Sequence, residues 1–296
     1  MNLEEQKISS RKVILCALLL CLPAIISQTL LAGESKITWP VWDNNTPYPH
    51  TIFGMPAYNE NDPCHNIVRQ YSAFTVYYDD KVLSPRWTAI KVTRYIVDEN
   101  SKMKRPGTFK MDKLLKKKGY KVTKHGDYSN PLFGPKKWDR GHMVQFDDAR
   151  GYGKQAGNDS FYTSNICPQL KSLNEKGWLT LEKTCSEFAR DYKVVWIYTG
   201  PIYGAKKAPF TKGRKVPAPI AFYKIVASPL DNNNVNVLAF RMPQKPIPAG
   251  ADISKFLVTV RDIEKETGID FFRDLPDGVE EHIETNKTTL WPDLPN

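Results

Sequence analysis

Residues 136–153 read KKWDRGHMVQFDDARGYG and hold one histidine, His142, inside the quartet Asp139-Arg140-Gly141-His142. A lone histidine is more often a structural residue than a catalyst, so its role depends on what the rest of the chain supplies. The ordinary pKa of histidine lies near neutrality, which suits a general base. A lysine pair stands directly before the quartet, and a run of aspartates and glycines follows it.

Length and composition describe a globular chain. Its 296 residues are 41% hydrophobic, which is compatible with one large domain or two small ones. The formal net charge of +10 favours polyanionic partners such as nucleic acids, which it would attract over long distances in low salt. Lysines that serve only solubility would give the same charge, so charge alone does not assign a partner.

The N-terminal residues 1–32 are expected to be an export signal. Two cations, Arg11 and Lys12, precede an apolar run of 14 residues, and Ala32 ends a small-residue cleavage site. Cleavage would remove three cations and two acids, so the mature chain would keep a charge of +9. This interpretation predicts a secreted or periplasmic protein, and an uncleaved membrane anchor is the alternative.

Three cysteines remain beyond this signal, Cys64, Cys167 and Cys185. One disulfide and one free thiol would suit an oxidising compartment, but the pairing cannot be read from the sequence. Their spacing does not resemble that of a zinc site.

Two parts are expected after the signal, an extended lead-in over residues 33–68 and a single domain over residues 69–296. The lead-in is rich in Pro, Asn and Asp, and the domain shows neither an internal repeat nor a linker. β-branched and aromatic residues predict strands within this domain at 72–78, 86–97, 193–200, 218–228 and 235–242. Because strands and helices do not alternate regularly, the predicted fold class is α+β.

Two helices are expected in the same domain. One begins near Leu170 and packs an apolar face inward, while Asn174, Trp178 and Glu182 recur every four residues along another flank. The other lies within residues 259–268, with Thr259 as N-cap, a capping box and a terminal glycine.

A strongly basic segment, residues 102–124, precedes the histidine quartet. It carries ten cations against the single acid Asp112, with Phe109 and Tyr120 between them. Such a run is usually a solvated surface, but its position before the quartet makes it a candidate surface for steering phosphates.

Several common catalytic motifs are absent from the sequence, namely GxSxG, the phosphate-binding GxxxxGK[ST] and HExxH. Phosphodiester hydrolysis would need a base for water, a cation or metal for charge on the phosphate, and a means to hold the leaving oxygen. His142 can supply the base. Asparagine and carboxylate oxygens suit Mg²⁺, which keeps most of its waters and therefore needs few protein ligands.

The ordered motifs DRGH, SNICPQ and LNEKGWLTLE resemble the DNA/RNA non-specific endonucleases of the ββα-metal class. Four further stretches fit the family in the same order: RWTAIKVT, VWIYTGPIYG, VPAPIAFYKIV and FLVTVRDIEKETGIDFFRDLPD. The resemblance extends over about residues 65 to 280 and implies a mostly antiparallel central sheet flanked by helices. It also implies hydrolysis to 5′-phosphate ends with little sequence specificity, since contacts go mainly to the backbone.

The resemblance implies roles for residues at matching positions. His142 would be the general base, Asn174 the one direct protein ligand of Mg²⁺, with Mn²⁺ as a substitute, and Glu182 would hold metal-bound waters. The remaining site residues are Arg105 at the scissile phosphate, Asn165 shaping the site, Asp139 and Arg140 as turn residues that fix the histidine, and Lys136 and Lys137, with Arg105, as nucleic-acid contacts.

Two departures from the family pattern concern the substrate groove and the leaving group. Many relatives follow the quartet with an apolar residue and Ala-Pro, whereas this chain has Met-Val-Gln. Some relatives carry an arginine four residues after the helix glutamate, where this chain has Ser186, and Arg190 lies one turn further on.

The expected partners are DNA and RNA, bound through their phosphates. No obligate protein partner is evident, and a homodimer remains open. Two alternatives to the nuclease remain open: a non-catalytic polyanion-binding protein on the same fold, and a metal-dependent phosphodiesterase that acts on smaller or lipid phosphates.

Overall fold

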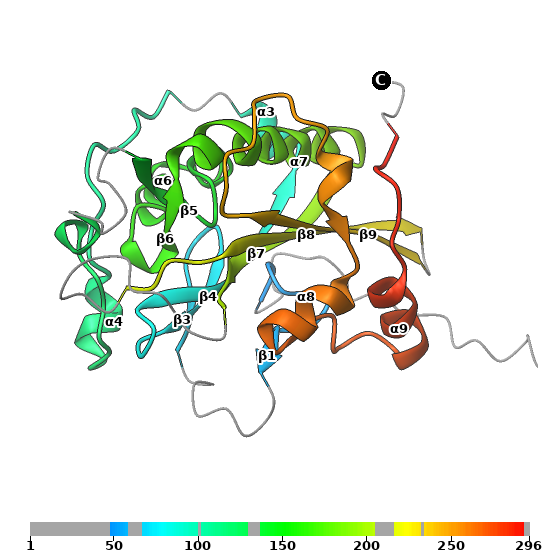
Figure 1. The fold of residues 1–296 in the computed structure, drawn as a ribbon, viewed down its shortest axis with the longest axis horizontal. Coiled ribbons are helices and arrows are strands. Elements are labelled where there is room, and N and C mark those ends of the chain that lie inside the picture. Colours follow the sequence, from blue (N-terminus) through cyan, green and yellow to red (C-terminus); the bar gives the residue numbers. More distant parts are fainter. Residues whose placement is uncertain are drawn as a thin grey trace, which may run out of the picture. The chain divides into compact units, whose positions relative to one another are not determined.

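A computed structural model describes residues 48–58, 67–99, 102–129, 137–204, 216–231 and 234–292, all within one compact unit. Its centre is a seven-stranded antiparallel sheet (Figure 1) in the order β10-β9-β8-β7-β4-β3-β2. The strands of this sheet are β2 (Val68–Gln70), β3 (Thr75–Asp79), β4 (Ser84–Thr93), β7 (Val194–Ile202), β8 (Ala221–Asp231), β9 (Asn234–Pro243) and β10 (Leu257–Val258).

Two short antiparallel pairs accompany the central sheet. They are β1 (Ala57–Tyr58) with β11 (Ile269–Asp270), and β5 (Trp138–His142) with β6 (Ile166–Leu170). The α-helices are α3 (Arg94–Asp98), α4 (Lys113–Lys117), α5 (Phe146–Gly151), α6 (Lys154–Asp159), α7 (Leu179–Asp191), α8 (Val260–Thr267) and α9 (Asp277–Thr285). Shorter helical turns are η1 (His125–Tyr128), η3 (Thr163–Asn165), η5 (Ile253–Phe256) and the π-helical η4 (Leu173–Trp178).

Helices cover both faces of the sheet because its strands are apolar on both sides. In β7, Val195 and Ile197 belong to the same core as α7. Tyr198 faces the opposite way and contacts the rings of Phe271 and Phe272, which lie between α8 and α9. Figure 1 shows α7 on one side of the sheet and α8 and α9 on the other.

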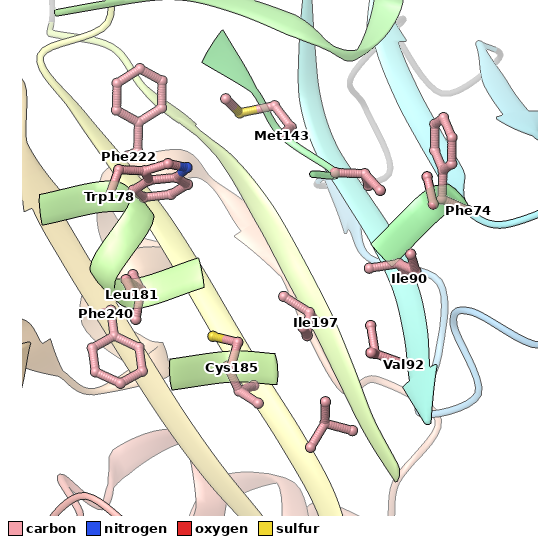
Figure 2. Packing of buried hydrophobic residues seen from close by; sticks show 14 of the residues in the cluster. Phe74, Ile90, Val92, Met143, Trp178, Leu181, Cys185, Ile197, Phe222 and Phe240 are labelled. Carbon is pink, nitrogen blue, oxygen red and sulfur yellow. The ribbon is translucent and has the colours of Figure 1, made fainter. Parts of the chain in front are cut away.

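The core on the α7 side is well filled. Figure 2 shows Trp178, Leu181 and Cys185 of the helical segment facing the strands that carry Phe222 and Phe240. Trp178 is fully buried, and its ring lies 5.6 Å from that of Phe222. This packing fixes η4 and α7 on the sheet, and with them the predicted site residues that they carry.

Residues 48–58, which belong to the predicted lead-in, pack on the α8 and α9 side. Phe53 is 1% exposed, and its ring contacts Trp196 and Phe272 with centroids 5.5 and 5.8 Å away. β1 adds backbone pairing to β11, with Ala57 opposite Asp270. These residues therefore contribute to the core, and the boundary at residue 69 stays a prediction.

One sequence prediction was wrong about where an element ends. The strand predicted at 86–97 ends at Thr93, because Thr93 Oγ1 accepts a hydrogen bond from the Ile96 backbone and so caps α3. The start of the helix predicted near Leu170 is confirmed, since Leu170 is the last residue of β6 and helical structure begins at Lys171.

The predicted outer flank of this helix also needs correction at Trp178. The four-residue spacing assumed α-helical winding, but η4 is π-helical and its backbone bonds span five residues. Trp178 is buried, while Asn174 and Glu182 are half-buried.

The predicted helix at 259–268 is confirmed in detail. Thr259 and Asp262 form the reciprocal capping box of α8, and Gly268 ends it in the left-handed conformation with φ 71°.

Cys167 and Cys185 are buried free thiols. The predicted signal at 1–32, Cys64 and Lys136 lie outside the described residues. No helix in the described ranges is long and apolar enough to cross a membrane.

Candidate active site

The quartet Asp139-Arg140-Gly141-His142 lies in strand β5, so the predicted turn was wrong. Pairing with β6 runs from Trp138 opposite Leu170 to His142 opposite Ile166. Gly141 is required by a close approach, because a Cβ there would lie 2.1 Å from the Gln169 side-chain oxygen. Regular pairing with β6 thus fixes the backbone of His142.

His142 is held in an aromatic pocket. Its side chain is 6% exposed, and its ring lies 5.1 Å from Phe109 and 4.8 Å from Phe161. His142 Nδ1 lies 3.5 Å from Nη2 of Arg105, and Nε2 is buried with no hydrogen-bond partner. Burial, followed by the positive charge of Arg105, lowers the pKa of His142 to about 3. The imidazole is therefore neutral throughout the physiological range.

Arg105 is exposed but well supported. Its guanidinium lies over the rings of Phe146 and Phe161, 5.5 and 5.3 Å from their centroids. These contacts place a fixed positive charge beside the neutral imidazole. The arrangement can receive an anion such as a phosphate next to a proton acceptor.

Asn165 fixes the backbone that follows His142. Its Oδ1 accepts from the Val144 amide, and its Nδ2 donates to the Val144 and Ser160 carbonyls, each at 2.9 Å. Its own carbonyl accepts from the Met143 amide. Asn165 is fully buried, so it acts on the site through the backbone.

Asn174 is oriented by Asp139. The Asn174 Nδ2 donates to the Asp139 carboxylate at 2.9 Å, which leaves the side-chain oxygen Oδ1 as its ligand atom. Burial raises the pKa of Asp139, and the hydrogen bond from Asn174 opposes that rise.

Glu182 belongs to a charged cluster on the α7 side of the sheet. Burial raises the pKa of Glu182 to about 7 and that of Asp148 to about 6, and Lys224 opposes both shifts. Lys224 is 3% exposed, donates to Thr199 Oγ1 at 3.0 Å and lies 4.9 Å from the centre of the Trp178 ring. This lysine is the buried counter-charge of two carboxylates.

Asp148 and Lys224 were not identified from the sequence. The available signal was the lone lysine of AFYKIV, a charge inside an otherwise apolar strand. Likewise Gln145, within the divergent Met-Val-Gln, donates to Ser186 Oγ at 3.3 Å, and Ser186 donates to the Glu182 carbonyl. The loop after His142 is thereby joined to α7.

The structure separates Arg140 from the histidine. Arg140 Nη2 donates to the His125 carbonyl and to Ser129 Oγ, at 3.3 and 3.4 Å. It therefore anchors η1 instead of a turn at His142. Arg190 is engaged elsewhere too, in ion pairs with Asp98 and Glu187.

The basic segment lies beside the histidine pocket. The backbone of Lys110 donates to the Phe161 carbonyl and accepts from the Thr163 amide, at 2.9 and 2.8 Å. Phe109 of this segment contacts His142 directly. Lys110 and Lys137 are exposed, so both can contact a solvent-borne polyanion.

The residues at this site fit a metal held by few protein ligands. In the described part of the chain, groups of three or more acidic, histidine or cysteine ligand atoms occur only at Glu264, Asp270 and Glu284, on the opposite side of the sheet. The candidate donors are the Asn174 amide, which is hydrogen-bonded to Asp139 of the quartet, and the Glu182 carboxylate, eight residues further along the same helical segment. This donor set suits Mg²⁺, which is bound in proteins by one or two oxygen ligands and several waters.

Comparison with known proteins places the chain in a family. A sequence model of the family described as DNA/RNA non-specific endonuclease matches residues 55–278. The mitochondrial nuclease of Saccharomyces cerevisiae is 27% identical over 240 residues, which cover 75% of this chain and 70% of that protein. The mitochondrial nuclease EXOG of Danio rerio is 30% identical over 233 residues, which cover 74% of this chain and 63% of that protein.

The fold has a counterpart among solved structures. A chain in the crystal structure of the EndoG/EndoGI complex superposes with a TM-score of 0.64 at 23% identity, over 77% of this chain and 91% of that chain. The likeness confirms the predicted α+β, ββα-metal fold class.

The family match covers most of the chain, and its relatives are named nucleases. The predicted enzyme class, a metal-dependent endonuclease that hydrolyses phosphodiester bonds, is confirmed. The chain belongs to the DNA/RNA non-specific endonuclease family.

Proposed function

We propose that the protein is an exported, Mg²⁺-dependent endonuclease that cleaves both DNA and RNA to 5′-phosphate ends. The observation that carries the proposal is the buried, neutral His142 with the Arg105 guanidinium 3.5 Å from its Nδ1. A proton acceptor and a phosphate-binding cation then stand side by side, as hydrolysis of a phosphodiester requires.

In this proposal His142 takes the proton of the attacking water at Nδ1. Arg105 Nη2 lies 3.5 Å from this nitrogen, which would therefore be the acceptor, and the buried Nε2 would carry the proton of the neutral ring. Arg105 binds the phosphate, and Lys110 and Lys137 attract the flanking backbone. Such contacts do not distinguish bases, which agrees with a non-specific nuclease.

Asn174 would hold Mg²⁺ through Oδ1, and Mn²⁺ could take its place. When bound, the ion would neutralise charge that develops on the phosphate. Glu182 would hold waters of the ion, and Lys224 favours the ionised carboxylate that this role needs. Because burial raises the pKa of Glu182 to about 7, its ionised form predominates only above that pH.

Replacing the base tests the proposal directly. The His142→Ala protein should lose about 100-fold to 10,000-fold in cleavage of supercoiled plasmid and ribosomal RNA, the usual contribution of a general base. It should keep its circular dichroism spectrum and its gel shift of DNA. His282→Ala, a change on α9, is the matched control and should cleave normally.

Other results of this assay would favour the alternatives. A native protein that binds DNA but shows no Mg²⁺-dependent cleavage would indicate a polyanion-binding protein. A native protein that hydrolyses only small phosphodiesters would indicate a phosphodiesterase. Full activity of His142→Ala would remove the proposed base.

The Asp139–Asn174 hydrogen bond predicts a specific effect on metal use. Asp139→Ala should raise the Mg²⁺ concentration for half-maximal cleavage by about 10-fold to 100-fold, because Asn174 then loses the acceptor that orients it. Glu182→Gln should raise it as well. Glu175→Gln, a change beside Asn174 of a residue that pairs with Lys171, should not. An unchanged Mg²⁺ requirement in Asp139→Ala would contradict the assigned ligand.

Export is proposed from the N-terminal sequence, whereas the relatives named above carry mitochondrial names. N-terminal sequencing of the protein recovered from a bacterial host that expresses the full chain checks this. A chain that begins at Gly33 in the periplasm or medium is the expected result. An intact Met1 in the membrane fraction would indicate an anchor, and an intact chain in the cytoplasm would contradict export.

A further inference from the structure

Three carboxylates converge on the side of the sheet opposite α7. Glu264 of α8, Asp270 of β11 and Glu284 of α9 each present an oxygen, and these atoms all lie within 4.8 Å of one another. The three residues belong to different elements, so the fold and not local sequence brings them together. None of them takes part in the nuclease site described above.

The positive charge at this cluster is small for the number of acids. Arg261 contacts three carboxylates at once, those of Glu264, Glu281 and Glu284, at 3.3, 2.6 and 2.9 Å. Within the described residues, no other cation forms an ion pair with these three glutamates or with Asp270. One guanidinium therefore faces four carboxylates.

Glu284 supplies the strongest indication that the cluster binds a cation. Its side chain is 1% exposed, and Oε2 accepts from Arg261 while Oε1 is buried without a hydrogen-bond partner. A buried carboxylate oxygen without a partner is costly, more so beside a second carboxylate.

We propose that Glu264, Asp270 and Glu284 bind a structural Ca²⁺ ion. Ca²⁺ accepts six to eight oxygen ligands in flexible geometry, so three carboxylates and added waters suffice, whereas Mg²⁺ demands a strict octahedron. Asp270 is exposed and gives the ion and its waters a route from solvent. The Phe271 amide donates to Glu264 Oε1 at 2.9 Å and orients that carboxylate.

The position of the site predicts what the ion does. It would join α8, β11 and α9, and β11 in turn pairs with β1 through Asp270 and Ala57. The ion would therefore stabilise the attachment of residues 48–58 and of both helices. Its effect should appear in thermal stability, independently of cleavage.

The test uses the Asn174→Ala protein, so that a metal at the nuclease site contributes little. Calorimetric titration should show binding of Ca²⁺. The unfolding midpoint should rise by about 5 °C between excess chelator and Ca²⁺ at about 100 times its Kd. Equal midpoints and no binding heat would overturn the proposal, and would mean that a shared proton relieves the carboxylates.

Two further variants identify the ligands. Glu284→Gln in the same background should abolish the Ca²⁺ heat and the shift, yet unfold in chelator no earlier than its parent, because the buried repulsion is removed. Glu281→Gln, which contacts Arg261 but is not one of the three ligands, should keep the shift. A Ca²⁺ shift that persists in Glu284→Gln would place the ion elsewhere and contradict the assignment.

Discussion

The proposed catalysis depends on the burial of His142 between Phe109 and Phe161. Desolvation, reinforced by Arg105, disfavours the charged imidazolium and keeps the ring ready to accept a proton. The surrounding contacts maintain this state: β5 pairs with β6, and Asn165 fixes the two residues that follow the histidine. Loss of the aromatic pocket would let the ring charge, and a charged ring cannot act as a base.

The other part of the proposed site, which consists of Asn174 and Glu182, depends on the packing of the helical segment that carries them. Packing of Trp178 on Phe222 fixes η4 and α7, and the partial burial of the Glu182 carboxylate raises its pKa. The positive charge of Lys224, on β8, opposes this rise in pKa and so favours the ionised carboxylate. The π-helical turn and the Asp139 contact orient Asn174 independently of this pair. The fold thus sets the orientation of the Asn174 amide and the charge of the Glu182 carboxylate, the two groups proposed to serve the metal.

Much of this could be predicted from the sequence, for identifiable reasons. Ordered motifs indicated the family and its fold, and the capping residues of α8 are local signals that tertiary structure did not override. The strand-to-helix change at Thr93 and the π-helical turn at Asn174 were missed, because periodicity does not reveal caps or wider winding. Arg140 was assigned to the histidine, although only the fold shows its contact with η1. Lys224 and Asp148 lie far from each other in the sequence, so their electrostatic interaction with Glu182 could not be predicted before the fold was known.

The most direct test of the central claim is a pH titration of the His142 imidazole by ¹⁵N NMR in the Mg²⁺-free protein. The His142 ring should stay neutral from pH 5 to pH 8, with the proton on Nε2 and the acceptor lone pair on Nδ1. A ring that titrates near the ordinary histidine pKa of about 6.5 would contradict this claim, and so would a proton on Nδ1, because neither state leaves the proposed base ready beside Arg105.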